Sequence, residues 1–160
     1  MQPVTIFVDF DGTIVEHQYP KIGPVAPHAI RVLRRLQDAN HLLVLNTYRA
    51  DARNGTLDKA VSFLADTWKT GKTDLKSFHA IMSSKAQPAS FFLHGKLQIH
   101  NDRTVGGVIY LDDEAIGMPT IFASSNKNKV VDWLEVEKIL EEYHLFEPAD
   151  TTKLSTSLYE

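Results

Sequence analysis

Short apolar runs that alternate with helical patterns constrain this chain of 160 residues more than any other feature. Residues 4–10, 41–45 and 108–111 are compact runs, rich in β-branched and large aliphatic side chains, that are typical of buried strands. Residues 29–36 and 57–68 separate the runs and repeat apolar side chains at helical spacing. Strands that alternate with helices predict an α/β fold built on a doubly wound parallel sheet.

Weaker signals complete the expected order of elements. Residues 16–27 contain three prolines and a glycine and predict a loop. Further along the chain, the pattern predicts a third strand over 77–82, a small hairpin over 91–99, a fifth strand over 120–123 and an acidic amphipathic helix over 131–146. We expect the arginines of the first helix to form its solvated face: Arg31, Arg34 and Arg35.

Length and composition predict one domain over residues 1–148, followed by a polar tail over 149–160. The formal net charge of −3 excludes a generally basic nucleic-acid binder. The absence of cysteine excludes thiol nucleophiles and Cys-ligated zinc. No apolar run is long enough to span a bilayer, and the first residues lack the basic region of a signal peptide, so we expect a cytoplasmic protein that does not bind membranes.

Polar side chains follow three of the predicted strands. Asp9 and Asp11 follow the first strand, Asn46 and Thr47 the second, and Asp112 and Asp113 the strand over 108–111. The carboxyl ends of parallel strands meet at one edge of a sheet, which is where ligands bind in such folds. Four carboxylates gathered there repel one another, and a hard divalent cation relieves the conflict. An all-oxygen ligand set favours magnesium or calcium over zinc.

The same residues suit chemistry on phosphate. A carboxylate can attack phosphorus to form a covalent intermediate, a role that Asp9 would fill. Asp11 would then act as the acid and base, and Thr47 would hold a phosphoryl oxygen. Gly12 allows the backbone to approach an anion closely, and Arg49 is a further candidate for facing phosphate or substrate.

Three segments resemble the haloacid dehalogenase-like (HAD) superfamily. VDFDGT at residues 8–13 resembles its first motif, DxDx(T/V), Asn46-Thr47 resembles the second, and YLDDEAIG at 110–117 resembles the fourth. The resemblance covers roughly residues 4–120, and the segment 8–23 looks like a group of small bacterial HAD hydrolases. It implies a HAD-like Rossmannoid fold with a minimal cap or none, and magnesium-dependent hydrolysis of a phosphomonoester through an aspartyl-phosphate.

Carried over by position, the resemblance implies a role for each acidic residue. Asp9 would be the nucleophile and Asp11 the general acid and base. Asp112 and Asp113 would hold Mg²⁺ together with Asp9 and the backbone carbonyl of Asp11. Thr47 would bind phosphate.

The sequence departs from the family at the third motif, where a lysine is expected shortly before the last acidic strand. No lysine lies directly upstream of Val108. Lys85 is the favoured substitute because it follows the predicted third strand, and Lys96 and Arg103 are the alternatives.

Two other functions remain open at this stage. One is a catalytically weak module that binds a phosphorylated ligand, and the other is a phosphotransferase that uses the same site. The spacing of the motifs leaves room for no large cap. An open site suits a large phosphorylated substrate, whose identity the sequence does not reveal, or a homo-oligomer whose neighbour supplies the lid.

Overall fold

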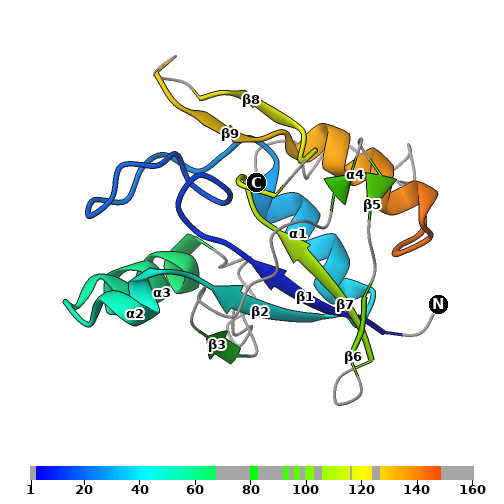
Figure 1. Cartoon of the computed structure of the whole chain (residues 1–160), viewed down its shortest axis with the longest axis horizontal. Coiled ribbons are helices and arrows are strands. Elements are labelled where there is room, and N and C mark those ends of the chain that lie inside the picture. The colour runs from blue at the N-terminus through cyan, green and yellow to red at the C-terminus, as the bar shows by residue number, and fades with distance from the viewer. Residues whose placement is uncertain are drawn as a thin grey trace.

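A computed structural model of the chain describes residues 3–67, 80–82, 92–93, 96–97, 100–102, 106–115, 117–123 and 127–148. Four helices occur in these ranges: α1 (Ala29–Asp38), α2 (Arg49–Ala52), α3 (Thr56–Thr67) and α4 (Trp133–Glu142). The strands there are β1 (Thr5–Val8), β2 (Leu42–Asn46), β3 (Ala80–Met82), β4 (Phe92–Leu93), β5 (Lys96–Leu97), β6 (His100–Asp102), β7 (Gly106–Leu111), β8 (Thr120–Phe122) and β9 (Lys129–Val131). The result is a mixed α/β fold (Figure 1).

The central sheet has five strands in the order β3-β2-β1-β7-β6. Strand β1 pairs in parallel with both β2 and β7, and β2 pairs in parallel with β3. The chain therefore builds outward from β1 through β2 to β3 and then returns to the other side of β1. This reversal between β1 and β7 is the kind of switch point beside which α/β sheets bind ligands.

The sequence pattern predicted a parallel sheet. The observed sheet is not purely parallel, because β6 runs antiparallel to β7. Asp102, at the end of β6, is paired with Gly106, at the start of β7. So short a connection between neighbouring strands permits only antiparallel pairing, since a parallel crossover needs a dozen or more residues. The hairpin expected over 91–99 is confirmed by the antiparallel pair β4 and β5.

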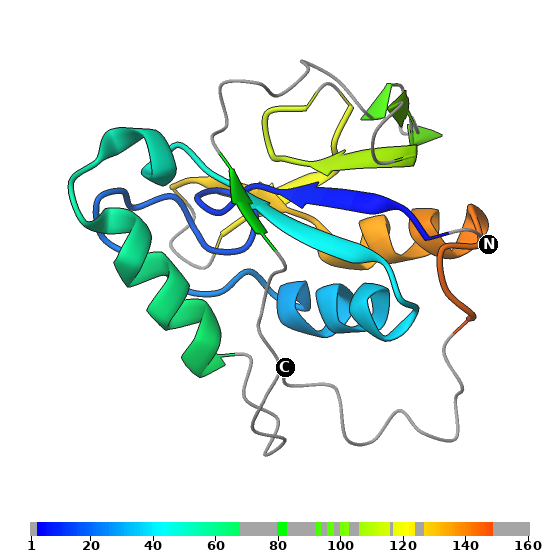
Figure 2. The same cartoon turned by 90° about the horizontal axis from the view of Figure 1, so that it is seen from below.

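Helices α1 and α4 lie against one face of the sheet (Figure 2). Their apolar sides and the strands form one core, which includes Ile30, Leu33 and Leu36 of α1 and Val136 and Leu140 of α4. The first helix was therefore predicted correctly from its apolar spacing.

The expectation of a solvated arginine face on α1 is wrong for Arg31 and Arg35. Both side chains form ion pairs with Glu137 of α4, and Arg35 also contacts Glu141 at 2.8 Å. The side chains of Arg31 and Glu137 are each only 12% exposed, so the pair lies inside the contact between the helices. The helical pattern of one segment does not reveal which charged residues a distant segment places opposite it.

The end of the described chain also differs from the prediction. The strand predicted over 120–123 is β8, but it pairs with β9 as a separate hairpin and does not join the central sheet. The amphipathic segment predicted as a helix over 131–146 is helical only in α4. Asp132 fixes the start of α4, since its side chain accepts a hydrogen bond from the backbone N–H of Glu135 at 3.3 Å. Within the described ranges, no helix has the length and the apolar character needed to cross a membrane.

Candidate metal centre and active site

Two aspartates leave neighbouring strands at the switch point of the sheet. Val8 and Leu111 are register partners in the parallel pair of β1 and β7, so the residues that follow them, Asp9 and Asp112, emerge side by side. The backbone N–H of Asp9 continues the ladder by donating to the carbonyl of Leu111 at 2.9 Å. The backbone therefore fixes the separation of the two residues.

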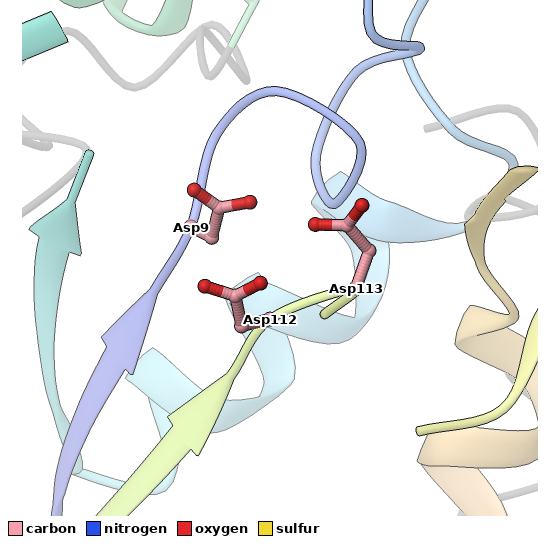
Figure 3. Close-up of side chains that lie close together, drawn as sticks. All are labelled: Asp9, Asp112 and Asp113. Carbon is pink, nitrogen blue, oxygen red and sulfur yellow. The ribbon is translucent and has the colours of Figure 1, made fainter. Parts of the chain in front are cut away.

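Asp113 completes a cluster of three carboxyl groups (Figure 3). One carboxylate oxygen from each of Asp9, Asp112 and Asp113 lies within 4.8 Å of those of the other two. A turn follows Asp112, whose side chain accepts the backbone N–H of Glu114 at 2.9 Å. This turn directs Asp113 back toward the loop that follows β1.

Thr13 ties that loop to the cluster. Its hydroxyl lies 3.0 Å from Oδ2 of Asp9 and 3.3 Å from Oδ1 of Asp113, and it accepts the backbone N–H of Asp113 at 3.0 Å. Its carbonyl accepts the indole N–H of Trp133 at 2.8 Å, which anchors the loop to α4. The fully buried Thr13 thus links both acidic segments to the core.

Close packing of the acids shifts two of their pKa values. Burial, together with the charges of Asp112 and Asp113, raises the pKa of Asp9 well above its ordinary value. Burial and the charge of Asp112 raise the pKa of Asp113 to about 6. Both shifts mean that the folded chain carries carboxylate charge at a cost in free energy, which a bound cation would offset.

Gly12 is required by the geometry of this loop. Its φ of +86° is in the left-handed region that favours glycine. A Cβ at this position would lie 2.4 Å from Oδ2 of Asp113, well inside van der Waals contact. Any larger residue would therefore displace a member of the cluster.

Asp11 lies apart from the three clustered acids and pairs with Arg49. Nε and Nη2 of Arg49 donate to the two carboxylate oxygens of Asp11, each at 2.8 Å. The Arg49 side chain is fully buried. The sequence suggested that Arg49 could face phosphate; the structure instead places it against the second aspartate of the first motif.

Thr47 is buried one residue beyond β2, at the same edge of the sheet as Asp9. Its hydroxyl accepts the backbone N–H of Arg49 at 3.2 Å, and its carbonyl accepts that of Ala50 at 3.1 Å, so it begins the turn into α2. Strand β3 reaches the same edge, since Met82 pairs with Asn46. Lys85 and Arg103 lie outside the described residues, and Lys96 is described only as part of the backbone of β5.

The pairing of Arg49 with Asp11 was the main feature that sequence reasoning missed. The signal that pointed to it is an arginine three residues after the end of a buried strand whose neighbour in the predicted sheet ends in aspartates. The signal was read as a contact with a ligand, because nothing in the local sequence shows which acid an arginine will meet.

The chain was compared with protein-family models, curated proteins and solved structures. No protein-family model matches the chain, and no curated protein matches it. The chain is similar to a solved structure described as the conserved protein coded by a locus from Bacteroides thetaiotaomicron, with 25% sequence identity and a TM-score of 0.56. The match covers 97% of this chain and 99% of that one, so the similarity extends over nearly the full length of both chains.

Proposed function

We propose that this protein is a magnesium-dependent phosphomonoester hydrolase of the HAD-like type, with a doubly wound Rossmannoid core and little or no cap. The observation that carries the proposal is the cluster of Asp9, Asp112 and Asp113 at the switch point of the sheet, with Thr47 at the same edge. The order of these residues along the chain also matches the motifs that the sequence resembles. The proposal is therefore supported by the placement of these residues and by their order along the chain.

The cluster fits a hard divalent cation. Its donors are three carboxylates, the ligand type that magnesium prefers, with no nitrogen or sulfur donor among them. Burial and the neighbouring carboxylates raise the pKa values of Asp9 and Asp113, and a cation bound at the cluster would offset the cost of holding their charge there. When bound, Mg²⁺ would neutralise negative charge on the ligands and on the phosphate; Asp9, Asp112 and Asp113 would hold it, with the carbonyl of Asp11 as a further expected ligand.

In the first chemical step, a carboxylate oxygen of Asp9 attacks phosphorus. The bond between phosphorus and the alcohol oxygen breaks, its electron pair stays on that oxygen, and Asp11 donates a proton to it. In the second step, Asp11 takes a proton from water, and the water oxygen attacks phosphorus. The bond to Asp9 then breaks, so both aspartates return to their starting states and the net products are an alcohol and inorganic phosphate.

Thr47 and Lys85 are proposed to bind the phosphoryl oxygens in both steps. The nucleophile and the substrate are both anionic, so positive charge beyond the metal is needed near the phosphoryl group. Arg49 does not meet this need because all five of its N–H groups bond within the protein. Lys85 follows a strand whose carboxyl end reaches the edge that carries Asp9, and this remains the reason to favour it over Lys96 and Arg103.

Turnover of p-nitrophenyl phosphate, measured with Mg²⁺ and with EDTA, tests the proposal. We expect hydrolysis that requires Mg²⁺ and disappears in the Asp9→Asn variant. Asp38→Asn is the matched control, since Asp38 is an exposed aspartate at the far end of α1. Hydrolysis that persists in EDTA or in Asp9→Asn would contradict the proposal. Binding of inorganic phosphate without any turnover would favour the ligand-binding module, and transfer to an added alcohol would favour the phosphotransferase.

A further inference from the structure

The guanidinium of Arg49 uses all five of its N–H groups inside the protein. Two bonds go to the oxygens of Asp11, at 2.8 Å each. The other three go to backbone carbonyls: Pro20 at 3.2 Å, Lys21 at 2.9 Å and Thr56 at 3.3 Å. Five donors are all that a guanidinium has, so none is left for a phosphate.

The surroundings of Arg49 fix its position as well as its bonds. The side chain is fully buried, and the rings of Phe10 and Tyr19 lie with their centroids 5.1 Å from its central carbon. Its partners come from two segments: the long connection between β1 and α1, which supplies Asp11, Pro20 and Lys21, and the start of α3, which supplies Thr56. The guanidinium is therefore held by the fold, and it holds Asp11 in turn.

We propose that Arg49 is a positioning residue that orients the carboxyl group of Asp11 for proton transfer to the leaving group. This inference rests on the proposed hydrolase function. A two-pronged guanidinium fixes both the position and the plane of a carboxylate. Each oxygen of Asp11 keeps further acceptor capacity, because a carboxylate has about four lone-pair sites and Arg49 occupies two. The proton that Asp11 donates therefore occupies one of the remaining lone-pair sites, and Arg49 fixes the directions in which those sites point.

Lysine cannot perform this function, although it keeps the charge. It has a single ammonium group with three donors and cannot reproduce the planar fork. In Arg49→Lys, the three backbone carbonyls and Asp11 would compete for fewer donors, and the Asp11 carboxyl would be free to rotate. A role in orientation therefore predicts that the conservative variant fails.

The test compares two substrates that differ in their need for a proton. The alkoxide that leaves an alkyl phosphate must be protonated, whereas p-nitrophenolate leaves without protonation. We expect Arg49→Lys to lower the rate at which a simple alkyl phosphate releases its alcohol in the first turnover by about 10²–10³-fold, within the range for general acid catalysis. The first-turnover release of p-nitrophenolate should fall by about tenfold or less, and the affinity for either substrate should change little. The first turnover is the readout because the second step, in which Asp11 activates water, is common to both substrates.

A double-mutant cycle shows whether Arg49 acts through Asp11. Asp11→Asn should give the same substrate dependence of the first-turnover rate, and the double variant Asp11→Asn/Arg49→Lys should release alcohol from the alkyl phosphate little more slowly than Asp11→Asn alone. Arg31→Lys is the matched control, since Arg31 also forms a two-pronged pair with a carboxylate, Glu137, but in the contact between α1 and α4. It should affect both substrates equally.

Thermal melting establishes whether each variant is folded. If Arg49→Lys does not fold, Arg49→Gln replaces it, because glutamine leaves no unpaired ammonium group in the core. Equal losses in the first-turnover rate on the two substrates would reduce Arg49 to a structural role and overturn the inference. Additive losses in the double variant would overturn it too. These outcomes differ from failure of the proposed function, in which the wild-type protein hydrolyses neither substrate with Mg²⁺.

Discussion

Asp9 and Asp112 stand next to each other because Val8 and Leu111, the residues before them, are register partners in adjacent parallel strands. The hydrogen bond from the N–H of Asp9 to the carbonyl of Leu111 extends this register to the site itself. Side-chain rotation alone therefore cannot move the two acids far apart. The sheet imposes repulsion on the protein without metal, and this repulsion is the basis of three of the following predictions.

Asp9→Asn should abolish activity and stabilise the protein in the absence of metal. Asparagine is nearly isosteric but cannot form an acyl phosphate, so turnover should fall by about 10⁴-fold or more. Removing a carboxylate whose pKa is raised by burial and by two neighbouring acids should raise Tm in EDTA. Kinetics and melting curves on the same sample check both effects. A variant with near-normal turnover would eliminate Asp9 as the nucleophile.

Magnesium should raise Tm, and EDTA should reverse the effect. A ligand that binds only the folded state at about 100 times its Kd adds about 2.7 kcal/mol, which corresponds to roughly 5–10 °C in a protein of this size. The rise should shrink in Asp112→Asn and be retained in the exposed control Asp38→Asn. If the melting curve is the same with and without Mg²⁺, the three acids do not form a metal site.

Stability without metal should fall as the pH rises from about 4 to about 6. Burial and the neighbouring Asp112 raise the pKa of Asp113 from 3.8 to about 6, so the folded state binds more protons than the unfolded state in this window. Stability decreases with pH wherever the folded state binds the extra protons. Melting curves in EDTA across the window should therefore show a smaller decrease in Tm for Asp113→Asn than for the wild type.

The same linkage applies to magnesium. In the proposed site, protons and Mg²⁺ would compete for these carboxylates, so the increase in Tm caused by Mg²⁺ should shrink below about pH 6. An increase that is constant from pH 5 to about pH 8 would show that Asp113 does not take part in binding.

Glu137 should show the opposite pH dependence. Burial alone would raise its pKa, but hydrogen bonds from Arg31 and Arg35 outweigh this and lower it from 4.5. Its contribution to stability is therefore full above pH 4.5 and is lost as the pH falls through the lowered pKa. Glu137→Gln should cost about 1–3 kcal/mol near pH 7, as expected for hydrogen bonds to a charged group. The exposed Glu142→Gln should cost much less, and equal effects in denaturant titrations would contradict this account.

The sequence was sufficient to predict the parts of the fold that depend on local periodicity. The spacing of Ile30, Leu33 and Leu36 predicted α1, and the apolar run before Asp9 predicted β1. The convergence of Asp9, Asp112 and Asp113 followed from a single rule, that parallel strands end at the same edge. That rule holds whatever the details of the loops.

Features that depend on contacts between distant segments could not be predicted in this way. The antiparallel edge strand β6 and the separate hairpin of β8 and β9 are choices of partner, which a short strand pattern does not encode. The ion pairs formed by Arg31 and Arg49 show the same limit. Arg31 meets Glu137 across 106 positions and Arg49 meets Asp11 across 38, so the sequence identified the charges but not their partners.

The most direct test of the account is to trap the phosphorylated protein during turnover and locate the modified residue. Acid quenching followed by borohydride reduction converts the acyl phosphate of an aspartate to homoserine, which peptide mass spectrometry identifies. The proposed mechanism predicts homoserine at position 9, only when phosphomonoester and Mg²⁺ are both present. Turnover with no modification at position 9, or with the modification at Asp11, Asp112 or Asp113 instead, would contradict it.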